Sequence, residues 1–185
     1  MPYQNDSVTS KNLVLGNCKV EAALSALGDW SNLGAGMVSI WAHDVVKFST
    51  QAGNAPDPLS GISSEVIKVD FELIEFDASV LTTIHGGLIT ASTVSSVITI
   101  SAGGHDDNTI SERAFRFTNK RTISGNSVNT ILTVFHATMD TGPRFAWKSD
   151  NDEDPIMVMA NSITGEVDTS RTQGVQLYTL SHALP

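Results

Sequence analysis

The acidic residues near position 150 are the clearest candidates for a metal-binding site. Asp150, Asp152 and Asp154 are spaced like the first ligands of a calcium-binding loop. Such a loop also needs a glycine at its sixth position and a glutamate at its twelfth, where this chain has Pro155 and Asn161. We therefore interpret the acidic run as a solvated loop and predict no bound metal.

The histidines and the cysteine follow no known metal-binding or catalytic spacing. The histidines are His43, His85, His105, His136 and His182. No two of them have the separation found in helical zinc motifs or in zinc fingers. His105 precedes Asp106 and Asp107, but the glycines and the asparagine around them are typical of a turn. Cys18 is the single cysteine, which excludes an internal disulfide, and its apolar neighbours indicate a small buried residue.

The chain also lacks the glycine-rich phosphate loop and the nucleophile motif of serine hydrolases. Its 185 residues are 41% apolar and 17% charged, which is typical of a globular protein. With 20 Asp and Glu against 11 Lys and Arg, the net charge is −9, and such a field repels the phosphates of nucleic acid. We therefore expect a structural protein without a cofactor rather than an enzyme.

Several of the basic residues lie close together in the sequence, at Arg113, Arg116, Lys120 and Arg121. Phe115 and Phe117 alternate with the polar positions beside them, which predicts a strand with one apolar face and one basic face. Three roles remain open for the basic face. It is exposed to solvent, it contacts the acidic loop 150–154 of a neighbouring copy, or it binds nucleic acid.

Alternation of apolar and polar residues predicts a mainly β protein. The clearest strand covers 65–76, where Ile67, Val69, Phe71 and Leu73 alternate with the polar face Lys68, Asp70 and Glu72. Directly after it, Asp77 can cap a short helix over 77–85, which Gly86 and Gly87 end. Further strands are predicted at 12–15, 19–23, 37–41, 45–48, 94–101, 114–118, 130–138, 156–162 and 175–181.

Two stretches are predicted to be long loops. The stretch 49–63 contains the chain-breaking residues Gly53, Pro56 and Pro58, and the stretch 140–155 contains the acidic run. A shorter turn is predicted at the glycines of 34–36, and residues 1–11 are predicted to be a flexible polar arm. We find no linker, so we expect a single domain over 1–185. The absence of a secretion signal and of a long apolar run predicts a soluble protein made in the cytosol, without contact with a membrane.

The order of these elements follows a familiar layout. The polar arm precedes NLVLGNCKV and the strand MVSIWAHDVVKFS, and a Pro/Gly loop then leads to EVIKVDFELIEF and the helix DASVLTTIHGG. The second half contains FRFTNKR, NTILTVFHATMD, RFAWKSDNDEDPIMVMANSI and VQLYTL. Over most of the chain, this layout resembles the major tail proteins, or tail tube proteins, of long-tailed, siphovirus-like bacteriophages.

The resemblance implies a β-sandwich or barrel with one flanking helix and no catalytic residues. It also implies homohexameric rings that stack into a tube in the virion tail, made in the host cytoplasm. The inner strands would line a channel through which DNA passes without specific binding. The long loop and the terminal arm would contact adjacent rings, and other tail proteins would bind the ends of the tube.

For such a ring, we expect the exposed polar face of Lys68, Asp70 and Glu72 to line the channel. The candidates for contacts between subunits are Gly53, Pro56, Pro58, Arg113, Arg116, Lys120, Arg121, Asp150, Asp152 and Asp154. The alternatives are another tail or head–tail joining protein of similar fold, or a subunit of a secretion tube. A β-sandwich that binds carbohydrate or a receptor is a further alternative, although Trp30, Trp41 and Trp147 do not cluster in the sequence.

Overall fold

The computed structural model of the chain describes residues 17–50, 59–74, 78–85, 89–95, 97–102, 112–123, 126–142, 144–148 and 156–183. Its elements are β1 (Asn17–Ala23), β2 (Ser31–Thr50), β3 (Leu59–Leu73), α1 (Ala78–His85), β4 (Ile89–Val94), β5 (Val97–Ala102), β6 (Arg113–Ile123), β7 (Asn126–Met139), β8 (Arg144–Lys148), β9 (Ile156–Gly165) and β10 (Tyr178–His182). The chain is mainly β with a short helix, which confirms the predicted fold class. The described residues contain no helix with the length and apolarity needed to cross a bilayer.

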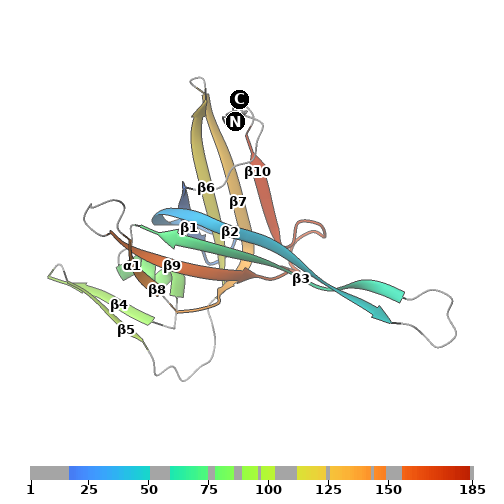
Figure 1. Cartoon of the computed structure of the whole chain (residues 1–185), viewed down its shortest axis with the longest axis horizontal. Helices are drawn as coiled ribbons and strands as arrows, with labels where there is room; N and C mark the ends of the chain where they lie inside the picture. Colours follow the sequence, from blue (N-terminus) through green and yellow to red (C-terminus); the bar gives the residue numbers. More distant parts are fainter. Residues whose placement is uncertain are drawn as a thin grey trace, which may run out of the picture.

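The strands close on themselves as a barrel. They form an eight-stranded antiparallel sheet in the order β10-β7-β6-β1-β2-β3-β9-β8, and β4 and β5 form a separate two-stranded sheet. Because β7 also pairs with β9, the strands β7, β6, β1, β2, β3 and β9 make a continuous ring. β6, β7 and β10 run across the direction of β2, β3 and β9, so the barrel has two crossing walls (Figure 1).

Side chains of the two walls meet inside the barrel. The inward residues of β3 are at most 1% exposed: Ile67, Val69, Phe71 and Leu73. The ring of Phe71 lies edge-on to the ring of Phe117 on β6, with 5.1 Å between the ring centres. The alternation predicted for 65–76 is confirmed as far as Leu73, where the strand ends. The next residue, Ile74, is 47% exposed.

α1 is the flanking helix that the sequence predicts. Its Val80 and Ile84 are 7% and 1% exposed, and both belong to the core of the barrel. Arg113 Nε donates a hydrogen bond to the Thr83 carbonyl oxygen at 3.2 Å. This bond satisfies one of the carbonyls that the last turn of a helix leaves without an internal partner. The predicted cap, Asp77, lies outside the described residues.

The predicted turn at 34–36 is wrong, because these residues belong to β2. Gly34 has a φ of 113°, and the pairing of β1 with β2 shifts register between Val20 and Glu21. A Cβ atom on Gly36 would lie 2.5 Å from the Glu72 carbonyl oxygen. The glycines therefore bend β2 and allow its close approach to β3, without interrupting the strand.

Both predicted long loops are shorter than the sequence indicates. β2 continues to Thr50 and β3 begins at Leu59. The described residues of the predicted loop 49–63, which are 49–50 and 59–63, are therefore all in strands. β8 lies within the predicted loop 140–155. The predicted strands 37–41 and 45–48 are one strand, and the predicted strand 94–101 spans the hairpin of β4 and β5. The predicted arm 1–11 and strand 12–15 lie outside the described residues.

Candidate assembly surfaces

A long hairpin projects from the barrel, and we call it the arm, defined as the described residues 44–50 and 59–66. Its two strands pair from Asp44 opposite Val66 to Thr50 opposite Leu59. Figure 1 shows the arm extending away from the crossing walls at the right of the view. Sequence reasoning missed the arm because Gly53, Pro56 and Pro58, which lie outside the described residues, dominate the local composition.

The arm exposes large apolar side chains. Val46 is 54% exposed, Phe48 is 44% exposed and Ile62 is 55% exposed. Ile62 is paired with Lys47 and Phe48 is paired with Gly61, so the apolar side chains of these neighbouring pairs point to opposite faces. Large apolar side chains gathered on both faces of a projecting hairpin are typical of a surface that another protein covers.

Cross-strand contacts hold the arm as a defined hairpin. A Cβ atom on Gly61 would lie 2.8 Å from the Phe48 ring, so this ring lies directly over the glycine. Further along, the Ser63 hydroxyl donates a hydrogen bond to the Val46 carbonyl oxygen at 3.0 Å. At the root, the Trp41 ring meets the Tyr178 ring of β10 edge-on at 5.6 Å. These contacts fix the direction in which the arm leaves the barrel.

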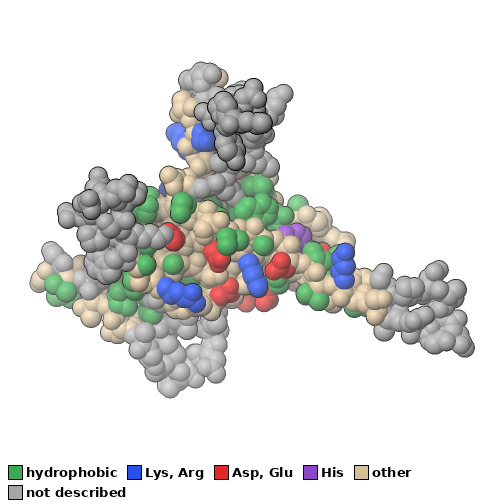
Figure 2. Space-filling model, viewed as in Figure 1, with side chains coloured by type: hydrophobic (Ala, Val, Ile, Leu, Met, Phe, Trp, Pro, Cys, Tyr) green, Lys and Arg blue, Asp and Glu red, His purple; other side chains and the backbone are tan. Residues whose placement is uncertain are grey.

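The polar face of β3 lies on the outside of its wall. Lys68 is exposed, whereas Asp70 and Glu72 are half-buried, so the two carboxylates are less open than predicted. The register places residues of β2 and β9 on the same face: Met37, Ile40, Ala42, Ala160, Ser162 and Thr164. Figure 2 shows acidic side chains gathered with some basic ones in the middle of this view. That this face lines a channel stays a prediction.

A hollow of about 390 Å³ opens on the polar face and is lined in part by Asp70, Glu72, Asp140 and Arg144. The Ser162 hydroxyl donates a hydrogen bond to Asp140 Oδ2 at 3.1 Å and helps to fix this carboxylate. Three carboxylates against one guanidinium give the hollow an acidic character, which disfavours phosphate. Among the described residues, no group of His, Cys, Asp and Glu side chains is arranged to hold a metal ion.

The basic residues of β6 do not share one face, in contrast to the prediction. Arg116 and Lys120 lie on the outer side, but Arg121 has the same orientation as the buried Phe117. Arg113 lies before a register shift between β6 and β7 and binds the Thr83 carbonyl of α1. A strict period of two already places Arg113 and Arg121 with Phe115 and Phe117, so only Arg116 and Lys120 fit a basic outer face.

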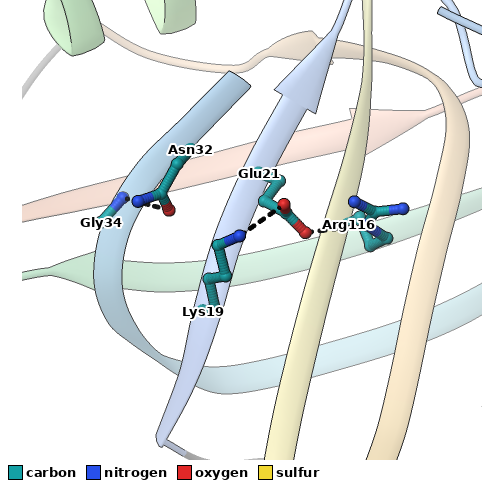
Figure 3. A network of polar contacts seen from close by, with 5 residues as sticks. All are labelled: Lys19, Glu21, Asn32, Gly34 and Arg116. Atoms are coloured by element: carbon teal, nitrogen blue, oxygen red, sulfur yellow. Dashed lines mark hydrogen bonds and ion pairs between the residues drawn. The ribbon is translucent and has the colours of Figure 1, made fainter. Parts of the chain in front are cut away.

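Arg116 and Lys19 both bind Glu21, whose side chain is 9% exposed (Figure 3). Lys19 Nζ donates to Oε1 at 2.7 Å, and Arg116 Nε donates to Oε2 at 2.8 Å. The guanidinium of Arg116 also lies 4.3 Å from the centre of the Trp30 ring. Burial raises the pKa of Glu21, but the hydrogen bonds from Arg116 and Lys19 outweigh it, and this pKa lies below its usual value. Arg116 is therefore engaged within its own chain.

The structure describes only some of the remaining residues that the sequence analysis singled out. Asp150, Asp152 and Asp154, like the side chain of Trp147, lie outside the described residues. Trp30 contacts Arg116 and Trp41 contacts Tyr178, so these two tryptophans have different partners. Cys18 is buried, as predicted, and burial raises its pKa to about 11.

No family model matches the chain, and no curated protein is similar enough in sequence to count as a relative. Three surfaces of the fold bear on function: the apolar arm, the polar face of β3, and the unpaired outer edges of β8 and β10 within the described sheet.

Proposed function

We propose that the chain is a structural subunit that assembles with copies of itself into stacked rings, and that these rings form the tail tube of a long-tailed bacteriophage. The tube is a channel for DNA, and other tail proteins bind its ends. The observation that carries the proposal is the apolar arm projecting from a closed barrel. The role is structural, and we assign no reaction to the chain.

The arm supports assembly because its exposed apolar side chains are unusual for a monomer in water. Fully burying a large apolar side chain contributes about 1.5–3 kcal/mol, and because Phe48 and Ile62 are already about half-buried, covering the rest of each contributes roughly half of that. Both faces of the arm carry such side chains, so an arm inserted between two neighbouring copies buries apolar surface on each side. A ring supplies this arrangement in every subunit, because each copy has the same two neighbours.

The sheet edges and the charge of the outer face also fit a tube. Within the described sheet, β8 and β10 each pair on one side only, and such edges are prone to pair with another chain. Pairing between subunits would satisfy them. The acidic face around Asp70 and Glu72 suits a channel wall, because a negative wall lets the phosphates of DNA slide past without binding.

Electron microscopy and sedimentation of the purified full chain test the proposal directly. At increasing protein concentration, we expect rings or tubes of uniform diameter in negative stain and a matching rise in sedimentation coefficient. Tubes favour the tail tube, whereas single closed rings favour a terminator or joining protein of the same fold. Monomers that stay dispersed at high concentration would exclude both.

A pair of variants separates assembly from folding. Phe48→Asp with Ile62→Asp removes the exposed apolar surface of the arm, and we expect a folded monomer that no longer polymerises. Lys47→Gln changes the same hairpin at an exposed polar site and serves as the matched control, which should assemble normally. If the double variant still forms long tubes, the arm is not an assembly element.

A further inference from the structure

An open hollow of about 520 Å³ lies where β1, β2 and β6 run side by side. Its lining combines an apolar floor with polar groups at the rim. Cys18, Ala35 and Ile74 contribute apolar surface, while Lys120 and Asn32 contribute polar groups. Gly34 and Gly36 also line the hollow, at the bend of β2. We call this hollow the basic pocket.

The charge around the basic pocket is opposite to that of the whole chain. Lys19, Arg116 and Lys120 lie on this outer face with one carboxylate, Glu21, which Lys19 and Arg116 already bind. Lys120 is exposed and makes no ion pair or hydrogen bond within the described residues. A local excess of positive charge in a protein of net charge −9 is a site for an anionic partner.

We propose that the basic pocket binds carboxylates of a second copy of the chain, presented by its acidic segment 150–154. The proposal rests on the self-assembly proposed above and names the surface that one copy offers to the next. Lys120 supplies the charge, and the side-chain amides of Asn17 and Asn32 supply neutral donors at the rim.

Charge complementarity selects this occupant. The segment 150–154 carries Asp150, Asp152, Glu153 and Asp154, which is the densest run of carboxylates in the sequence. A contact between two different surfaces of the same chain is heterologous, and repeated contacts of this kind form a ring where the rotation between neighbours closes. Nucleic acid is disfavoured because its continuous phosphates would also meet the acidic face of β3 and the net negative charge.

A labelled synthetic peptide, Lys148–Ile156, tests the pocket by fluorescence anisotropy with dilute full chain. Two forms of the full chain serve as hosts, meaning the proteins to which the peptide binds. One is the wild type. The other carries Asp150→Asn, Asp152→Asn and Asp154→Asn, so that its own segment does not compete with the peptide for the pocket. We expect both hosts to bind the peptide, and we expect salt to weaken the binding. Lys120→Glu should weaken it about tenfold, as expected for reversing an exposed charge pair. Ala35→Leu, at an exposed position, should block it by filling the floor.

The controls separate the pocket from general charge effects. Lys68→Glu reverses an exposed lysine on β3 and should leave peptide binding unchanged. A peptide with Asp152→Lys and Asp154→Lys should bind the Lys120→Glu host better than it binds the host with Lys120. Thermal melting by circular dichroism checks that each variant is folded.

Any of four outcomes would overturn the inference. Peptide affinity that is unchanged by Lys120→Glu and by Ala35→Leu would show that the peptide binds elsewhere on the chain. Binding seen only with the acid-depleted host would show that the segment occupies the pocket of its own chain. A short single-stranded oligonucleotide that binds the pocket more tightly than the peptide would point to nucleic acid. If the chain forms tubes but does not bind the peptide, the proposed pocket contact is wrong and the proposed function stands. If the chain binds the peptide but stays monomeric, the proposed function is wrong and the pocket contact stands.

Discussion

Gly165 lies opposite Ile67, and a Cβ atom on this glycine would be 2.6 Å from Ile67 Cγ2. On its other side, Gly165 pairs with Ala137 of β7. It is one of the three residues, Ile163 to Gly165, at which β9 is paired with both β3 and β7, where the two crossing walls join and the barrel closes. The closure depends on the absence of a side chain at this position.

We predict that Gly165→Ala destabilises the fold. The new methyl group would also lie 2.5 Å from Val134 Cγ1, so it would overpack the buried junction of β3, β7 and β9. Overpacking of this kind costs about 1–3 kcal/mol in free energy of unfolding. Gly142→Ala is the matched control, because a Cβ atom there meets nothing within 4 Å. Urea denaturation measures both, and equal stability of the two variants would contradict the assigned closure.

Glu21→Gln should destabilise the chain by about 1–3 kcal/mol, since it removes a charged acceptor from Lys19 and Arg116. The loss should fall in the lower part of that range, because both cations are partly exposed to solvent.

The Glu21 contribution also depends on pH. The pKa of Glu21 is lowered from 4.5 in the folded chain, so the unfolded chain binds this proton first as the pH falls. The stabilisation is present above pH 4.5 and is lost as the pH falls through the folded pKa. The difference in unfolding free energy between wild type and Glu21→Gln should therefore shrink at acid pH, and a constant difference would argue against the ion pair.

His85 should make the fold sensitive to mild acid. It is 1% exposed, and within the described residues neither ring nitrogen makes a hydrogen bond of good geometry. Burial lowers its pKa from 6.5 to about 4, while the side chain of Asn161 acts weakly in the opposite direction. Between these values the unfolded chain binds a proton that the folded chain does not, so the free energy of unfolding falls as the pH falls.

His85→Leu is the variant that isolates this effect. Leucine fills a similar buried volume and does not titrate, so the variant should lose part of the decline in unfolding free energy between pH 6.5 and pH 4. The other histidines are unchanged in both proteins and cancel in the comparison. Parallel pH profiles for wild type and variant would show that His85 is accessible to protons in the folded chain.

The sequence predicts the mainly β class and the clearest strands because their side chains alternate with a period of two. Ile67 to Leu73 show that pattern, and the structure confirms it. The arm was missed because Gly61 and the nearby prolines are local turn signals, whereas pairing with the opposite strand decides the outcome. The turn predicted at Gly34 and Gly36 was wrong for the same reason. These glycines bend β2, but pairing with the neighbouring strands keeps it continuous.

The contacts that shape the candidate surfaces were beyond sequence reasoning. Glu21 and Arg116 are 95 positions apart, and no local pattern links them. The register shift between Arg113 and Phe115 is likewise set by pairing with β7, whereas the alternation itself already places Arg113 and Arg121 off the basic face. Both features follow from tertiary pairing, which a single sequence does not reveal. The basic pocket likewise arises from three strands, β1, β2 and β6.

The charge on the polar face of β3 allows a test of the proposed channel. Asp70→Lys with Glu72→Lys changes two negative charges on the outer face of β3 into positive ones, and both sites are half-buried outside the core. The variant should fold with a modest loss of stability, of about 1 kcal/mol. If the polar face lines the channel, tubes of the variant should retain DNA, and added salt should release it.

A variant with Asp44→Lys is the control for that experiment; it adds two units of positive charge per chain, and the double variant adds four. Asp44 is exposed at the root of the arm, so this substitution also adds positive charge without changing the polar residues of 68–72. DNA retained inside tubes of the double variant, and protected there from nuclease, would support the channel. DNA bound equally by both variants and digested by nuclease would place Asp70 and Glu72 on the outer surface of the assembly, because only DNA enclosed by the wall escapes the enzyme.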